Sequence, residues 1–308
     1  MIKNLSRQKL IILLILSALL FQGCGMFGYH VSIYKSKFPY SGVFKNRDEL
    51  QLAYRIRFPY LEPEDSTKTP LVLYIDGSGP YPIDYARDKI LAHFQSKGFV
   101  AAMIQKRGVK PSEGRFSKLT FEERIQDNLD FIEYLLQKYP RINPEQVYII
   151  GHSEGATVVG AVAYEYKKTA GLIWISAGFN EDFYDIIASH HPKQIKELEK
   201  IRSGKYKKGK FAHRSKDWYY QHFNYLHFPK LIELSSPILF LMGENDEEYL
   251  SLKKRYEDMK LQGKQNISFY SISGVGHGTI ATTNQEPMFS IIDKWLEHKL
   301  VNGSSIKN

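Results

Sequence analysis

The feature that most constrains the fold of this chain is a serine between two glycines: residues 151–155 read Gly-His-Ser-Glu-Gly. The apolar run 147–150 before them predicts a strand, and the small residues of 156–163 after them predict a helix. A G-x-S-x-G sequence between a strand and a helix is typical of a sharp turn that holds a nucleophilic serine. The backbone of such a turn is strained, and a side chain two positions to either side would clash. We therefore predict that Ser153 is an exposed nucleophile; the alternative is a plain glycine-flanked turn.

A serine hydroxyl attacks well only when a base takes its proton and an acid orients that base. Asp246 follows the apolar strand predicted at 237–242, at the strand end where open α/β sheets place their chemistry. His277 lies in a glycine-rich loop after the strand predicted at 267–272. Each alone fits a structural role, but their joint order favours Asp246 as the acid and His277 as the base. Alternative acids, which fit an exposed helix start better, are Glu244, Glu247 and Glu248.

A second glycine-rich loop is expected to hold the negative charge that forms when a serine attacks a carbonyl. The apolar strand 70–75 ends in Asp-Gly-Ser-Gly-Pro at 76–80. Preorganised backbone N–H groups stabilise a developing oxyanion. We expect one N–H from Glu154, the residue after the nucleophile, and the other from Ser78, with Gly79 as the alternative. The proline that ends the loop has no N–H to donate, and a simple glycine turn is the alternative interpretation.

Predicted strands and helices alternate along the chain, which indicates the α/β class with a mostly parallel sheet. A capping box of Thr120 and Glu123 begins the amphipathic helix predicted at 120–138. The other predicted elements are strands at 52–58, 99–105 and 171–175 and helices at 83–97 and 287–300.

Together, the serine turn, the glycine loop at 76–80, Asp246 and His277 resemble the α/β-hydrolase superfamily over about residues 45–300. The segment 105–114 resembles the loop after strand four in the esterase, thioesterase and peptidase-like branches of that superfamily. The resemblance implies an α/β-hydrolase fold, with a mostly parallel central sheet flanked by helices and a helical cap insertion.

The resemblance also implies a serine hydrolase with a triad of Ser153, Asp246 and His277 and no cofactor. We expect it to cleave carboxylic esters, acting on a small-molecule ester or acyl substrate through an acyl-enzyme intermediate. A serine peptidase or an acyl thioesterase of the same superfamily is the alternative, and a non-catalytic surface binding protein is the second. Asp76 stands where many relatives have histidine. We expect its carboxylate to accept hydrogen bonds from loop N–H groups rather than to face the oxyanion.

The segment 178–235 lies where this superfamily inserts a cap over the active site, and its charged and apolar residues have helical spacing. Between residues 193 and 216 it carries ten Lys or Arg against two Glu. This basic stretch fits a surface for anionic lipid headgroups or acidic substrates, or a merely solvated helix face. An aromatic run that we expect to roof the acyl pocket comprises Trp218, Tyr219, Tyr220, Phe223, Tyr225 and Phe228. The alternative is that these rings only pack on the body of the domain.

The N-terminus predicts export. Basic residues precede an apolar core at 10–21, which is shorter than the ~20 residues needed to span a bilayer, so 1–23 is predicted to be a signal peptide. Cys24, the only cysteine of the chain, follows a small residue directly after this core, as at a bacterial lipoprotein processing site. We expect lipidation at Cys24, a tether over 24–45 and anchoring to a lipid membrane of the bacterial cell envelope. An ordinary signal peptide or an uncleaved anchor is the alternative.

Composition and motifs indicate a single catalytic domain, with a hydrolase core of 46–177 and 236–300 around the cap insertion of 178–235. The net charge of +9 falls to +6 without Lys3, Arg7 and Lys9. Nucleic-acid binding is not expected, because the chain has no matching module and an exported protein rarely meets nucleic acid. The histidines have no compact metal-ligand spacing, so no metal is expected. No nucleotide-binding fingerprint follows any strand.

Overall fold

The computed structural model describes residues 40–60, 68–278, 280 and 285–303. The predicted signal peptide, Cys24 and the tether up to residue 39 lie outside the described residues. Within the described part of the chain, no helix combines the length and the apolar character needed to cross a membrane.

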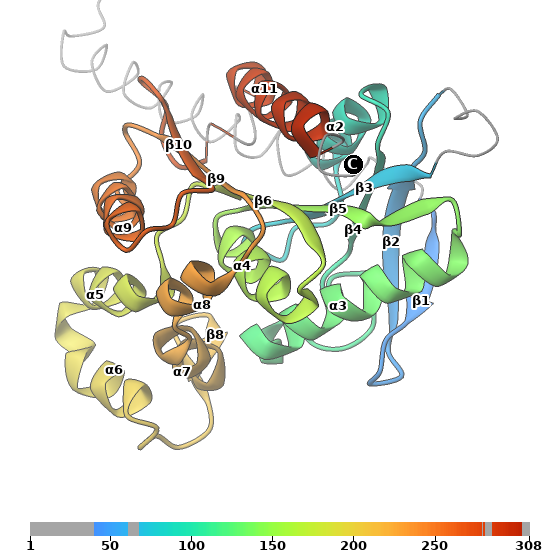
Figure 1. Cartoon of the computed structure of the whole chain (residues 1–308). Helices are drawn as coiled ribbons and strands as arrows, with labels where there is room; N and C mark the ends of the chain where they lie inside the picture. Colours follow the sequence, from blue (N-terminus) through green and yellow to red (C-terminus); the bar gives the residue numbers. More distant parts are fainter. Residues whose placement is uncertain (1–39, 61–67, 279, 281–284, 304–308) are drawn as a thin grey trace, which may run out of the picture. The chain divides into compact units, whose positions relative to one another are not determined.

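An eight-stranded sheet runs through the centre of the described chain (Figure 1). In sheet order its strands are β1 (Gly42–Lys45), β2 (Gln51–Arg57), β4 (Val100–Ile104), β3 (Thr69–Ile75), β5 (Ile142–His152), β6 (Thr169–Ile175), β9 (Ile238–Gly243) and β10 (Ile267–Ile272). β2 is antiparallel to β1 and β4, and all pairs from β4 to β10 are parallel. The loops that follow β3, β5, β9 and β10 therefore leave the same edge of the sheet.

β1 corrects one expected boundary. Residues 42–45 were expected to belong to the tether, but they pair with β2 as the edge strand of the sheet. The side chain of Phe44 is buried and packs on the ring of Phe131, with ring centroids 5.0 Å apart. This burial stabilises a strand whose four residues are too few to show a pattern in the sequence.

Helices cover both faces of the sheet (Figure 1). On one face lie α2 (Tyr85–Ser96) and α11 (Gln285–Gly303), and on the other lie α3 (Phe121–Lys138), α4 (Glu154–Tyr166) and α9 (Tyr249–Leu261). Each face has its own apolar core, and the central strands are buried on both sides, as parallel strands must be. The predicted capping box is present: Thr120 accepts from the N–H of Glu123, whose carboxylate accepts from the N–H of Thr120. The mostly parallel sheet with flanking helices is confirmed.

We term residues 176–237, which lie between β6 and β9, the insertion. It holds α5 (Asn180–His190), η2 (Pro192–Gln194), α6 (Ile195–Arg202), α7 (Lys216–Asn224) and α8 (His227–Glu233), with a short hairpin of β7 (Lys210–Phe211) and β8 (Arg214–Ser215). A small core of its own holds it together, with the buried side chains of Leu198, Ile201, Phe211, Trp218, Tyr219 and Phe223.

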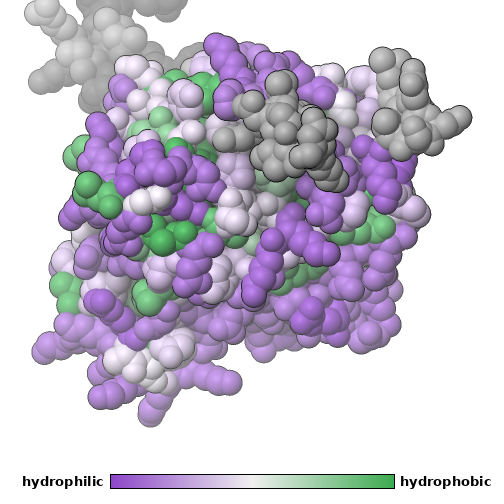
Figure 2. Space-filling model, in the orientation of Figure 1, coloured by the Kyte–Doolittle hydropathy of each residue, from purple (hydrophilic) through white to green (hydrophobic). Residues whose placement is uncertain are grey.

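On the face of the molecule that Figure 2 shows, hydrophilic residues predominate and hydrophobic ones form small, separated groups. The large apolar side chains that the fold requires are mostly inside the three cores rather than on this surface.

Candidate functional site

Ser153 lies at a strained turn between β5 and α4. Its φ is +57°, a backbone conformation that residues other than glycine rarely adopt. A Cβ added at Gly155 would lie 2.1 Å from the carbonyl oxygen of Ile75, and one added at Gly151 would lie 2.3 Å from the carbonyl oxygen of Gly155. Both positions therefore require glycine, and the turn has the geometry that the sequence predicts.

The structure brings together the three side chains that the sequence singles out. The Oγ of Ser153 lies 2.9 Å from Nε2 of His277, and Nδ1 of the same ring lies 2.9 Å from Oδ2 of Asp246. Asp246 comes from the turn after β9 and His277 from the loop after β10, so three loops at one sheet edge supply the three groups. With Nδ1 donating to the carboxylate, Nε2 is free to accept the proton of the serine hydroxyl.

The surroundings of His277 and Asp246 favour the ionised pair. The hydrogen bond to Asp246 raises the pKa of His277 above its ordinary 6.5, although burial acts in the opposite direction. Burial alone would raise the pKa of the Asp246 carboxyl, but hydrogen bonds from His277 and from the N–H of Glu248 lower it below 3.8. The side chain of Asp246 is fully buried, so the carboxylate stays ionised in contact with the imidazole.

The alternative acids lie elsewhere. Glu244 accepts a hydrogen bond from the hydroxyl of Ser271, and Glu247 is exposed beside His190. Glu248 is not the exposed helix residue that we expected. It is half-buried, accepts a hydrogen bond from the N–H of Gly178, and lines the cavity beside the nucleophile. Burial raises the pKa of its carboxyl.

The glycine loop after β3 touches the nucleophile. A Cβ added at Gly77 would lie 3.3 Å from the Cβ of Ser153, and Ser78 lines the same cavity as Ser153 and Glu154. Gly79 does not line this cavity; a Cβ added there would meet the ring of Tyr81 instead. Among described residues, the N–H groups of Ser78 and Gly79 donate to no hydrogen-bond acceptor. Glu154 is the first residue of α4, so its N–H has no acceptor within the helix.

Asp76 behaves differently from our expectation. Its carboxylate binds side-chain cations rather than N–H groups of the loop, with Nζ of Lys106 at 3.0 Å and Nε of Arg87 at 2.9 Å. Burial alone would raise the pKa of this carboxyl, but the two cations lower it well below its ordinary value. The carboxylate is therefore neutralised by partners that the local sequence does not reveal, and Asp76 does not line the cavity beside Ser153.

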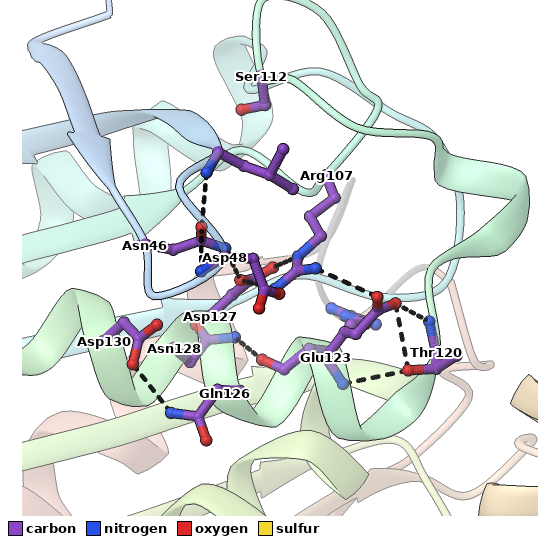
Figure 3. Close-up of polar contacts among 12 residues, drawn as sticks. Asn46, Asp48, Arg107, Ser112, Thr120, Glu123, Gln126, Asp127, Asn128 and Asp130 are labelled. Carbon is purple, nitrogen blue, oxygen red and sulfur yellow. Dashed lines mark hydrogen bonds and ion pairs between the residues drawn. The ribbon is translucent and has the colours of Figure 1, made fainter.

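The loop 105–114 is fixed to α3 by a buried arginine (Figure 3). The guanidinium of Arg107 lies 2.7 Å from Asp127 and 3.2 Å from Glu123, both on α3, and 2.6 Å from Asp48. Asn46 also donates to Asp127 at 2.6 Å. These contacts hold the neighbouring Lys106 at a defined place beside the glycine loop.

A cavity of about 210 Å³ adjoins Ser153, and the insertion forms much of its wall. Of the aromatic run expected to face it, Trp218 and Tyr219 line the cavity. Phe223 packs within the core of the insertion, Tyr220 is partly exposed, and Tyr225 and Phe228 pack on the main core. Further side chains of the insertion line the cavity, although the sequence did not place them there: Phe179, Asn180, Phe183, Ile187, His213 and His222.

The side chain of Glu154 is a feature that sequence reasoning missed. It is buried beside the nucleophile, 2.7 Å from Arg124 of α3 and 3.0 Å from Arg214 of the insertion. The indole of Trp218 donates to the same carboxylate at 3.1 Å. Burial alone would raise the pKa of Glu154, but Arg124 and its other donors lower it well below 4.5. Its partners lie tens of residues away, so no local signal could have found them.

His152, the residue before the nucleophile, contacts the loop that carries the base. Its Nε2 lies 3.0 Å from the carbonyl oxygen of His277. Burial lowers the pKa of His152 to about 4, so the ring is neutral at pH 7 and donates this hydrogen bond. The contact links the serine turn directly to the loop of the base.

No group of three potential metal ligands occurs in the part of the chain that the structure covers. Two of the histidines noted in the sequence are buried and hydrogen-bonded: His222 near Asn180, and His227 to the carbonyl of Thr157.

Comparisons with known proteins agree with this geometry. The sequence profile of the prolyl oligopeptidase family (Peptidase_S9) matches residues 86–303. No curated protein matches the chain.

Several solved structures have a similar fold. Est1E from Butyrivibrio proteoclasticus with ferulic acid bound is 18% identical, with a TM-score of 0.62 over 83% of this chain and 98% of Est1E. An acylaminoacyl peptidase of Pyrococcus horikoshii is 17% identical, with a TM-score of 0.64 over 88% of this chain and 43% of the peptidase. An esterase of Pyrococcus furiosus is 16% identical, with a TM-score of 0.61 over 85% of this chain and 91% of the esterase. The likenesses confirm the α/β-hydrolase fold.

Proposed function

Since the chain belongs to the prolyl oligopeptidase family of serine hydrolases, we propose that Ser153, His277 and Asp246 form a catalytic triad. We further propose that this triad cleaves carboxylic esters. The observation that carries the proposal is the unbroken chain of hydrogen-bond distances, 2.9 Å from serine to imidazole and 2.9 Å from imidazole to carboxylate. A non-catalytic binding protein has no need of this arrangement.

In the proposed reaction, Oγ of Ser153 attacks the ester carbonyl while Nε2 of His277 takes its proton. The tetrahedral oxyanion is stabilised by backbone N–H groups of Glu154 and the glycine loop. The intermediate collapses when Nε2 returns the proton to the departing alcohol, which leaves an acyl group on Ser153. Water then attacks this acyl-enzyme by the same route, and the acid is released. Asp246 holds the imidazole in the required tautomer throughout.

The cavity favours a compact or aromatic acyl group. Its volume of about 210 Å³ is below the ~300–1,000 Å³ of common ligand pockets. Its walls include the aromatic rings of Phe179, Phe183, Trp218 and Tyr219. Est1E, which shares the fold, has the aromatic ferulic acid bound. We therefore expect the insertion to act as a cap that selects short or aromatic acyl groups over long chains.

Amide cleavage is the second candidate, because the matching family is named for oligopeptidases and an acylaminoacyl peptidase shares the fold. The same triad serves both reactions, and the discrimination lies in the leaving-group side of the site. A thioesterase uses the same chemistry.

The test is hydrolysis by the purified full-length protein and its Ser153→Ala variant. Substrates are nitrophenyl acetate, butyrate, cinnamate and palmitate, an acyl thioester and an aminoacyl anilide. We expect cinnamate and the short esters to be preferred, and Ser153→Ala to lose about 1,000-fold or more in kcat/KM because the nucleophile is gone.

The matched control is Ser96→Ala, which changes an exposed serine at the end of α2 and should behave as wild type. Preferred anilide cleavage would support the peptidase instead. No turnover, and no labelling of Ser153 by a fluorophosphonate, would support the binding protein.

We also propose that the protein is exported and held at a membrane of the bacterial cell envelope by acyl chains on Cys24. The motif around this cysteine is the support, and two or more acyl chains give stable anchoring. The triad domain begins only a few tens of residues later, so its substrates would be met close to a membrane surface.

A further inference from the structure

Three consecutive carbonyl groups of the glycine loop after β3 each accept a hydrogen bond from a different buried cation. The contacts are Arg124 Nη2 to the carbonyl of Asp76 at 2.6 Å, Lys106 Nζ to that of Gly77 at 2.7 Å, and Arg214 Nη2 to that of Ser78 at 2.6 Å. We call these three cations the carbonyl clamp. They come from α3, from the loop after β4 and from β8 of the insertion.

The clamp fixes where the N–H groups of the same loop point. A peptide unit is planar and trans, so the N–H of one residue points opposite to the carbonyl of the residue before it. The carbonyl of Gly77 and the N–H of Ser78 share one such unit, and Lys106 holds that carbonyl. The carbonyl of Ser78 and the N–H of Gly79 share the next unit, which Arg214 holds. Both candidate oxyanion donors thus belong to peptide units anchored at their opposite ends.

The clamp itself is rigid, because buried carboxylates hold its members. Lys106 pairs with the carboxylate of Asp76 at 3.0 Å. Arg124 and Arg214 both pair with the carboxylate of Glu154, the residue whose N–H is the other expected oxyanion donor. The exposed fractions of the three clamp side chains are 6%, 3% and 1% for Lys106, Arg124 and Arg214, so little water competes for these hydrogen bonds.

Arg214 differs from the other two members because it comes from the insertion. Its guanidinium also stacks over the ring of Phe116, with 4.2 Å from Cζ to the ring centroid, and lies 5.0 Å from the ring of Trp218. One Nη2 atom contacts both the glycine loop and Glu154, which are the two sides of the oxyanion site. Moving the insertion away from the sheet edge would remove this contact.

We propose that the carbonyl clamp positions the oxyanion donors, and that Arg214 makes a competent oxyanion site depend on the docked insertion. This inference rests on the proposed function. Arg214, Lys106 and Arg124 are positioning residues, since they act through the loop and do not touch the substrate. We therefore expect the clamp to stabilise the charged transition state and to contribute little to binding of the uncharged substrate.

The first test compares Arg214→Met with wild type on nitrophenyl butyrate and on a matched pair of inhibitors. Benzyl trifluoromethyl ketone forms an oxyanion on Ser153, whereas benzyl methyl ketone of the same skeleton binds without one. We expect kcat to fall about 10- to 100-fold with KM changed less than about 3-fold. Affinity for the trifluoromethyl ketone should fall by the same factor as kcat/KM, while affinity for the methyl ketone stays unchanged. Arg214→Lys, which keeps the charge and one donor, should recover part of both losses.

Two further variants guard against a general loosening of the fold. Lys106→Met removes another clamp member but leaves Asp76 paired with Arg87. It should show the same loss of kcat and of trifluoromethyl ketone affinity. It replaces Arg214→Met as the test variant if Arg214→Met does not fold. Arg57→Gln breaks the ion pair with Asp88 that joins β2 to α2, and Arg57 contacts neither the glycine loop nor the insertion. It should leave kcat and both ketone affinities at the wild-type level.

The outcomes distinguish failure of this inference from failure of the proposed function. Clamp variants with wild-type kcat and trifluoromethyl ketone affinity would overturn the inference and leave the proposed function standing. Equal loss of affinity for both ketones, or the same loss in Arg57→Gln, would show that the cations support the fold only. If wild type neither turns over an ester nor reacts with a fluorophosphonate at Ser153, the proposed function fails, and the inference fails with it.

Discussion

At the scale of single residues, we expect the ionisation of two groups, the half-buried His277 and the buried Lys106, to set the pH range of the proposed active site. His277 must be neutral to accept the serine proton, and its hydrogen bond to Asp246 raises its pKa above 6.5. Burial lowers the pKa of Lys106 to about 8, although the Asp76 carboxylate acts in the opposite direction and Arg124 and Arg87 add to the lowering. The base is therefore active at high pH, and the charge of the clamp is present at low pH.

We predict a bell-shaped dependence of kcat/KM on pH for a short nitrophenyl ester. Activity should rise as His277 loses its proton, at a pH above 6.5, and fall as Lys106 loses its charge, near pH 8. Rates measured from about pH 5 to 10 would show both limbs. In Lys106→Met the alkaline limb should disappear, while the acidic limb stays. An alkaline limb that is unchanged in this variant would show that another group titrates.

At the scale of elements, the site depends on how loops are joined to helices. The loop 105–114 carries Lys106, and Arg107 ties it to α3 through Asp127, whose side chain is 3% exposed (Figure 3). The serine turn and the insertion are joined by Glu154 in the same manner. In both cases a buried ion pair joins segments that are far apart in the sequence.

We predict that Arg107→Met lowers the free energy of unfolding by about 3–5 kcal/mol, because it leaves the Asp127 carboxylate buried without its cation. The matched control is Arg47→Met, which removes a 2.8 Å contact to Asp130 on the same helix from a side chain that is 58% exposed. Its cost should be about 1 kcal/mol or less. Urea unfolding followed by circular dichroism would measure both. Equal costs would contradict the special role of the buried pair.

At the scale of the whole molecule, the proposed active site is composite. The sheet edge supplies the triad and the glycine loop, and the insertion supplies Arg214 and much of the cavity wall. We therefore propose that substrate selection and oxyanion geometry depend on a segment that is separate in sequence from the three triad candidates.

We predict that Cys24→Ser moves the protein from the membrane to the soluble fraction of the cell envelope, because the acyl chains can no longer attach. Fractionation of expressing cells, with incorporation of labelled palmitate into the wild-type protein, would measure this. Activity on soluble esters should not change, since the triad lies far along the chain. Membrane retention of Cys24→Ser would show that the apolar N-terminal segment itself is the anchor.

Local patterns of the sequence were sufficient for most strands and helices of the main sheet, the strained turn at Ser153 and the capping box at Thr120, but not for β1 or α9. Each of these depends on residues within a few positions of one another, so periodicity, glycine and capping chemistry reveal them. The position of Ser153, Asp246 and His277 after three strands of one parallel sheet also predicted that they meet, because parallel strands end at one edge.

Tertiary structure alone decided what surrounds these groups. Arg214 lies 136 positions from Ser78 and 60 from Glu154, and these contacts form only when the insertion packs on the sheet edge. The same is true of the cations on Asp76 and of the cavity position of Glu248. Buried charges must find partners wherever the fold brings them, and an isolated stretch of sequence contains no information about a partner that is supplied by another element.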